Sequence, residues 1–285
     1  MSFTSIELAD ETRHRWSGDS DSRPLVTRVW APSVAGPAPV IVLSHGTGGA
    51  AEDMTWLAEP LCNAGYLVAA VDHHGNSYND EYLVEGFAFL WERARELTLV
   101  LDYLINTFEV DERRIGAAGF SLGGYSVAAL LGARLSQPIV EAVFNGLVPA
   151  PDVPEFPQLI EKLAAAYSPD ELAVIVSDGV GSFADARVRA GFLMAPAVGQ
   201  LITRESFQEI KSPVAVRWGD ADDNCLPEEN ALVYLEALTN AQGQSVGADI
   251  GHYVFLGDRP DPSNVRGRAA VDAVAFFDCV FTEGN

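Results

Sequence analysis

Residues 116–126 read GAAGFSLGGYS and place Ser121 between Gly119 and Gly123. Glycines two positions before and after a serine allow a strand to fold back sharply into a helix, because a larger side chain at either position would collide with the returning backbone. Such a turn raises the serine hydroxyl out of the sheet. Because G-x-S-x-G also arises by chance, the other segments of the chain have to supply the partners of a nucleophilic serine.

Segments typical of strands and helices alternate along most of the chain. The apolar runs PVIVLS (39–44) and YLVAAVD (66–72) are typical of strands buried on both faces of a parallel sheet. Further strands are predicted at 24–31, near a sheet edge, and at 188–195, 213–218 and 245–250. Helices are predicted over 52–64, 87–108, 123–135, 203–210, 227–240 and 266–281. The alternation predicts an α/β fold with a mostly parallel central sheet and helices on both faces.

One segment, residues 146–186, breaks this alternation. It begins with the proline-rich GLVPAPDVPEFP and continues with helix-forming stretches before the sheet pattern resumes. An insertion directly after the helix that follows Ser121 is placed to form a cap over the serine, although it could equally be packing decoration. We expect a single domain over 1–285, with 146–186 as its cap insertion.

Composition limits the function classes. The 285 residues carry 18 basic and 40 acidic side chains, a formal charge of −22, which opposes binding to nucleic acid or to an anionic membrane. No apolar run approaches the roughly 20 residues of a membrane span, and the start of the chain lacks the pattern of a signal peptide. The cysteines are odd in number and far apart, which favours a reduced, cytoplasmic setting: Cys62, Cys225 and Cys279.

A serine nucleophile needs a base to take its proton and an acid to orient that base. In the α/β-hydrolases, whose serine turn this motif resembles, the order along the chain is nucleophile, acid, histidine. Four of the five histidines precede Ser121, so His252, in GHYVFL, is the predicted base. The acid is expected in the loop GDADDN (219–224), after a predicted strand. Asp222 is preferred there, with Asp223 and then Asp220 as alternatives.

An acyl-transfer reaction also needs donors for the oxygen that becomes negative in the tetrahedral intermediate. The backbone N–H of Leu122, directly after the nucleophile at a helix start, is one predicted donor. The second is expected in HGTGG (45–49), where Thr47 follows a strand end. A glycine-rich loop can also bind phosphate, but this one lacks the spacing and the lysine of a nucleotide loop.

Taken together, RPLVTRVWAP, IVLSHGTGG, GYLVAAVDHHGNS, GFSLGG, GDADDN and GHYVFL resemble the α/β-hydrolase superfamily over nearly the whole chain. More narrowly they resemble its dienelactone-hydrolase-like branch, which includes platelet-activating-factor acetylhydrolases. The resemblance implies a serine hydrolase with the triad Ser121, Asp222 and His252, an oxyanion hole of Thr47 and Leu122, and no cofactor.

The chain departs from this branch at two points. True dienelactone hydrolases use a cysteine nucleophile where this chain has Ser121, so their substrate is not implied. Pro227 falls one place later after Asp222 than the resemblance leads us to expect, which leaves Asp223 open as the acid.

The motif DHHGNS (72–77) invites a metal hypothesis, because Asp72, His73 and His74 are adjacent. Successive residues of an extended chain point to opposite sides and seldom converge on one ion, so a loop bordering the active site is the preferred interpretation and no metal is predicted. Three aromatic residues at helical spacing are expected in the core: Trp56, Phe87 and Trp91.

The sequence thus predicts hydrolysis of a small-molecule carboxylic ester through an acyl-enzyme. The same residues could cleave a thioester, lactone, amide or peptide, or transfer the acyl group to an alcohol. A non-catalytic binding module on this fold is the remaining alternative. Acyl chain length, leaving group and oligomeric state stay open.

Overall fold

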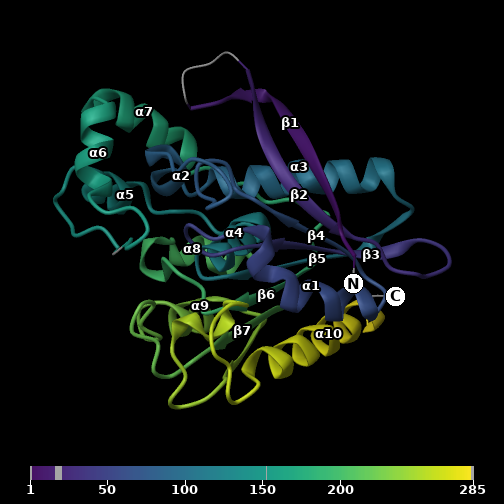
Figure 1. Cartoon of the computed structure of the whole chain (residues 1–285). Coiled ribbons are helices and arrows are strands. Elements are labelled where there is room, and N and C mark those ends of the chain that lie inside the picture. Colours follow the sequence, from purple (N-terminus) through teal and green to yellow (C-terminus); the bar gives the residue numbers. More distant parts are fainter. Residues whose placement is uncertain (1, 17–20, 152, 284–285) are drawn as a thin grey trace.

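The computed structural model describes residues 2–16, 21–151 and 153–283. Its centre is an eight-stranded sheet in the order β1-β2-β4-β3-β5-β6-β7-β8, with helices on both sides (Figure 1). The strands are β1 (Thr4–His14), β2 (Ser22–Trp30), β3 (Ala38–Ser44), β4 (Leu67–Val71), β5 (Val110–Phe120), β6 (Ala190–Met194), β7 (Val214–Trp218) and β8 (Ala241–Ser245). From β4 to β8 all neighbours are parallel, and β1 and β2 pair antiparallel at one edge. The predicted α/β fold with a mostly parallel sheet is confirmed.

The helices form two layers. The main ones are α1 (Thr55–Asn63), α2 (Val84–Ala88), α3 (Glu92–Thr107), α4 (Leu122–Leu131), α8 (Arg204–Glu209), α9 (Ala231–Ala237) and α10 (Val265–Glu283). Helices α1 and α10 pack against each other on one face of the sheet. Helices α3, α4, α8 and α9 contribute to the hydrophobic cluster on the other face.

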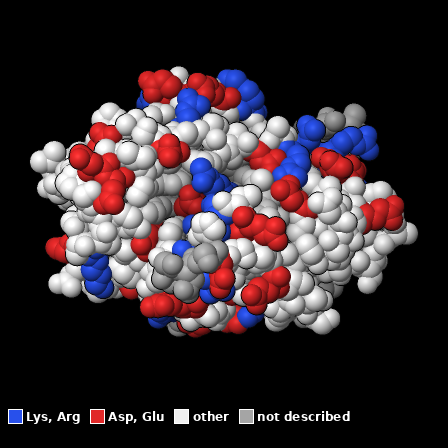
Figure 2. All heavy atoms as spheres, turned by 90° about the horizontal axis from the view of Figure 1, so that it is seen from above, with Lys and Arg blue, Asp and Glu red and all other residues white. Residues whose placement is uncertain are grey.

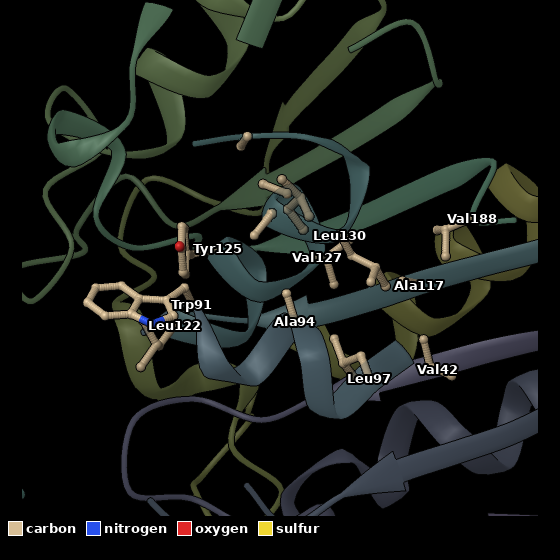
Figure 3. Packing of buried hydrophobic residues seen from close by; sticks show 14 of the residues in the cluster. Val42, Trp91, Ala94, Leu97, Ala117, Leu122, Tyr125, Val127, Leu130 and Val188 are labelled. Atoms are coloured by element: carbon tan, nitrogen blue, oxygen red, sulfur yellow. The ribbon is translucent and has the colours of Figure 1, made fainter. Parts of the chain in front are cut away.

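Small side chains on the sheet let the helix layer that contains α3 and α4 approach the strands closely. Helices α3 and α4 pack on β3 and β5, where Ala117 leaves room for their apolar side chains. Figure 3 shows this contact, with Val42, Ala94, Leu97, Ala117, Val127 and Leu130 labelled. Phe87 and Trp91 are buried, as predicted, and Trp56 is half-buried with its indole N–H donating to the Phe255 carbonyl.

The insertion carries its own helices, as predicted: α6 (Leu159–Ala166) and α7 (Pro169–Gly179). It follows α5 (Gln137–Phe144), and α7 packs on α5 while α6 packs on α2. In Figure 1 these helices stand beyond one end of the sheet. Gly179 lies so close to Trp91 that a Cβ there would overlap the indole ring, so the end of α7 is fixed against the main domain.

Three features differ from the sequence prediction. Strand β1 was not predicted, because it is an edge strand with many exposed polar side chains. The predicted helix 87–108 is split, since Phe89 and Trp91 are both buried and stack on each other, which residues two apart in one helix could not do. The last strand is β8 at 241–245 rather than 245–250, because Gly247, with φ of 151°, turns the chain away from the sheet.

On the face seen in Figure 2, charged side chains do not gather at one end. Figure 2 shows acidic groups scattered across one face, many of them beside lysine or arginine. Across the described ranges, every helix is too short or too polar to span a lipid bilayer.

The backbone is crowded at the serine turn. Ser121 has φ of 54° and ψ of −120°, an unusual conformation for a residue with a side chain. A Cβ on Gly119 would overlap the carbonyl of Gly123, and a Cβ on Gly123 would overlap the carbonyl of Ser44 at the end of β3. The glycines that the motif supplies are therefore required by backbone contacts.

Replacing Gly123 by alanine should destabilise the fold. The new methyl group would force α4 away from β3, and overpacking against the backbone costs about 3 kcal/mol or more. Urea denaturation followed by circular dichroism measures the change. Gly181→Ala is the matched control, because the nearest atom to its Cβ would be 3.6 Å away. Equal stability of the two variants would contradict this account of the turn.

Candidate active site

Three segments far apart in the sequence meet at the carboxyl ends of the parallel strands. Ser121 directly follows β5, Asp222 lies in the loop after β7, and His252 begins the short 3₁₀ helix His252–Phe255 that comes after β8. Because parallel strands end at the same edge of a sheet, their following loops are neighbours. The order of the strands thus brings a hydroxyl, an imidazole and a carboxylate together.

The three side chains form one hydrogen-bonded chain. Ser121 Oγ lies 3.0 Å from His252 Nε2, and His252 Nδ1 lies 2.7 Å from Asp222 Oδ2. With Nδ1–H donating to the carboxylate, Nε2 is free to accept the serine proton. All three side chains are at least 95% buried. This is the arrangement that a serine nucleophile needs.

Contacts in the loop after β7 single out one of the three candidate aspartates. The second oxygen of Asp222 accepts backbone N–H groups from Asn224, at 3.1 Å, and Cys225, at 2.7 Å. Asp223 is exposed, and exposed Asp220 instead accepts the indole N–H of Trp218. Of the three, Asp222 is the one in contact with His252.

The protonation of His252 is set by competing effects. Burial is the largest influence and lowers its pKa, but the hydrogen bonds and electrostatic interactions with Asp222 and Cys225 outweigh burial and raise the pKa to about 9. The imidazole is therefore largely charged at neutral pH and acts as a base in its neutral form, so its capacity to accept the serine proton rises as the pH approaches 9.

The backbone N–H groups of Thr47 and Leu122 have no acceptor within the described residues. The N–H groups of the next two loop residues are occupied, since Gly48 donates to Asn76 Oδ1 at 2.8 Å and Gly49 donates to the Gly46 carbonyl at 3.2 Å. The donors predicted from sequence are thus available to an oxygen bound beside Ser121.

The carbonyl sides of these two peptide groups are held firmly. The Gly46 carbonyl, which shares a peptide group with Thr47 N–H, accepts His45 Nδ1–H at 2.6 Å. The Ser121 carbonyl, which shares one with Leu122 N–H, accepts N–H groups from Gly124 at 2.8 Å and Ala197 at 3.1 Å. Donors on the carbonyl side both orient and polarise a peptide group.

A cavity of about 280 Å³ opens onto Ser121 and His252. Its walls come from the glycine loop, the segment after β8 and the insertion, and include Thr47, Asp53, Tyr78, Pro154, Glu155, Asn224, Tyr253, Asp258 and Arg259. A larger hollow of about 580 Å³ lies between α1 and α10, but it is mostly apolar and contains no nucleophile. The smaller cavity is therefore the candidate site.

A second hydroxyl–imidazole–carboxylate row lies beneath the glycine loop. His73 is 2.8 Å from Ser44 Oγ and 2.6 Å from a Glu96 oxygen, and all three side chains are almost completely buried. Burial first, and the charge of Arg93 second, hold the pKa of His73 well below its usual range. Because no substrate can reach this row, it supports the loop from below.

The motif 72–77 therefore belongs to the support of the site rather than to an ion. Asp72 accepts the backbone N–H of Ala51, and Asn76 accepts that of Gly48. Among the residues whose placement is described, no group of three metal-binding side chains is found. Tyr78, just beyond the motif, lines the cavity.

Two comparisons with known proteins found a similarity, one in sequence and one in fold. The model of the prolyl oligopeptidase family (Peptidase_S9) matches residues 52–137, which include Ser121 but end before Asp222 and His252. The solved esterase domain of a Rhodothermus marinus protein is similar, with a TM-score of 0.57 and 13% identity over 99% of this chain and 100% of that one. No curated protein sequence matches the chain.

The chain has the α/β-hydrolase fold. The family match and the structural neighbour together support a serine hydrolase of the α/β-hydrolase superfamily. They do not single out the dienelactone-hydrolase-like branch, which stays a prediction.

Sequence reasoning missed the residues that hold the glycine loop from the side. Tyr82 donates its hydroxyl proton to the Gly48 carbonyl at 2.6 Å, and Glu155 packs against the same glycine. Neither residue is in a motif. Only the proline-rich start of the insertion pointed to Glu155 as a residue near the site.

The titration of His252 tests this site independently of any substrate. We expect its pKa to be near 9 by NMR of the imidazole, and to fall in Asp222→Asn, which removes the largest single interaction that opposes burial and leaves that with Cys225. Because the folded-state pKa is raised, the charged imidazole stabilises the fold below pH 6.5. That contribution is lost as pH rises through about 9. A His252 pKa that is unchanged in Asp222→Asn would contradict the assignment.

Proposed function

We propose that the protein hydrolyses carboxylic esters through an acyl-enzyme on Ser121. The observation that carries this proposal is the buried hydrogen-bonded chain from Ser121 through His252 to Asp222, open to a cavity. The two free N–H groups beside the serine support it, as does the similarity in fold to an esterase domain.

In the proposed reaction His252 Nε2 removes the Ser121 proton while the hydroxyl oxygen attacks the ester carbonyl. The carbonyl oxygen becomes negative and accepts the N–H groups of Thr47 and Leu122. The imidazolium, held by Asp222, then gives its proton to the departing alcohol. A water molecule, deprotonated by the same imidazole, attacks the acyl-enzyme and releases the acid.

We also propose that the insertion 146–186 forms one wall of the substrate site within a single domain. Pro154 and Glu155 line the cavity, and Phe156 anchors this segment by stacking on Phe87 with ring centroids 4.7 Å apart.

A peptide or amide bond is the second candidate substrate. It is favoured by one observation, the match of residues 52–137 to the prolyl oligopeptidase family. The same nucleophile, base and N–H donors act on an amide carbonyl, so the triad does not distinguish the two reactions.

Removing the nucleophile should abolish turnover without unfolding the chain. Ser121→Ala is expected to lower kcat for an activated ester by about 10⁶-fold, and Asp222→Asn by about 10⁴-fold. A fluorophosphonate probe should label the unmodified protein and not Ser121→Ala. The neighbouring Asp223→Asn is the matched control and should keep its activity, since that carboxylate is exposed. Undiminished turnover in Ser121→Ala would refute the proposal.

The choice between ester and peptide can be made with matched substrates. We expect kcat/KM for a 4-nitrophenyl acyl ester to exceed that for the 4-nitroanilide of the same acid, and a prolyl peptide anilide to be cleaved more slowly still. The hydrolysis rates, corrected for the uncatalysed reactions and for the Ser121→Ala background, measure this order. Faster cleavage of the anilides would favour the peptidase.

A further inference from the structure

Arg93, on α3, is a buried cation with hydrogen bonds in several directions. It is 2% exposed, and every nitrogen of its guanidinium contacts an acceptor. The acceptors are Ser126 Oγ at 3.0 Å, Asn76 Oδ1 at 3.0 Å, Ser44 Oγ at 3.4 Å and the His45 carbonyl.

These acceptors belong to both walls of the proposed oxyanion hole. The His45 carbonyl begins the glycine loop that contains Thr47. On the other side, Ser126 Oγ accepts from Arg93 and donates to the Leu122 carbonyl at 3.0 Å, in the first turn of α4. One planar group therefore connects the loop that carries one free N–H with the helix that carries the other.

Asn76 adds a second connection to the loop. Its Oδ1 accepts from both Arg93 and the Gly48 N–H, and its Nδ2 donates to the Gly86 carbonyl at 2.9 Å. A loop with three glycines in HGTGG has little stiffness of its own. Its conformation has to be imposed by such contacts.

Burying the Arg93 charge costs free energy, which indicates that the guanidinium has a specific structural or functional role. Burial lowers the pKa of Arg93 to about 9, so the group stays charged at neutral pH, with Glu96 nearby as the opposite charge. Apolar residues of similar volume would often stabilise a core as well or better. Arginine differs in that its rigid fork fixes several acceptors at set angles, which a lysine ammonium cannot do.

We propose that Arg93 is a positioning residue of the oxyanion hole, which fixes the Thr47 and Leu122 N–H groups relative to each other by bonding the His45 carbonyl and, through Ser126, the first turn of α4. This inference rests on the proposed function. Arg93 touches no substrate. The oxyanion forms in the transition state. Loss of Arg93 should therefore weaken the stabilisation of the transition state more than it weakens the binding of the ester.

The test compares Arg93→Lys and Ser126→Ala with the unmodified protein. For each we measure kcat and KM with an activated ester, and the Ki of an aryl trifluoromethyl ketone, whose adduct with serine carries the oxyanion. Arg93→Lys should lower kcat and raise the Ki of the ketone by a similar factor, about 10- to 100-fold. KM should change by less than about 3-fold. Ser126→Ala removes only the connection to α4, so it should lower kcat and raise the Ki of the ketone by about 3- to 10-fold each.

Arg217→Lys is the matched control. Arg217 is equally buried, at 4% exposure, and is bonded to Asp272 and to the Val216 and Gln242 carbonyls. It is absent from the cavity walls. This variant should lose stability but keep kcat per active site, as titrated with a fluorophosphonate.

Two outcomes overturn the inference and can be told apart. If Arg93→Lys and Ser126→Ala lose stability while kcat and ketone affinity per active site match the unmodified protein, Arg93 is merely structural and the proposed function stands. If Arg93→Lys does not fold, the kcat of Ser126→Ala and its Ki for the ketone decide whether the inference holds. If the unmodified protein neither turns over esters nor binds the ketone, the proposed function fails, and this inference fails with it.

Discussion

The close approach of α4 to the end of β3 is the contact on which the rest of the site depends. Gly123 lies against the Ser44 carbonyl without room for a methyl group, and Gly119 lies against Gly123 in the same way. This contact forces the unusual backbone of Ser121 and brings the start of α4 beside the glycine loop. The position of Ser121 at the cavity and the proximity of the Leu122 N–H to the glycine loop are thus consequences of one packing constraint.

Beneath this contact lies a layer of buried polar groups. Arg93 and Glu96 supply opposite charges, and the neutral imidazoles of His45 and His73 lie close together between strands and loop, with ring centroids 4.9 Å apart. Burial first, and then the charge of Arg93, holds the pKa of both imidazoles well below the usual range. Both imidazoles therefore stay neutral near pH 7, and the group of this layer that titrates there is Glu96, whose pKa burial raises to about 7.

The sequence predicted the parts of the site that local rules determine. Glycine spacing identified the Ser121 turn, and chain order left His252 as the base, because both follow from steric limits and from the topology of parallel strands. It could not identify Arg93, which resembles any charged helix residue until the fold places it inside. Strand β8 was placed too late, since its sequence AQGQS is that of a polar edge strand and carries no apolar signal.

The family match covers only part of the proposed site. The matched segment, 52–137, contains Ser121, α4 and Arg93, whereas Asp222, His252 and the loop with Thr47 lie outside it. The cavity walls are divided in the same way, since Asp53 and Tyr78 lie within the match and 154–155 and 252–259 lie outside it. A fold shared with other hydrolases does not fix the substrate, which depends on the side chains around the site. We therefore propose that the insertion and the segment that begins at His252 contribute to substrate preference.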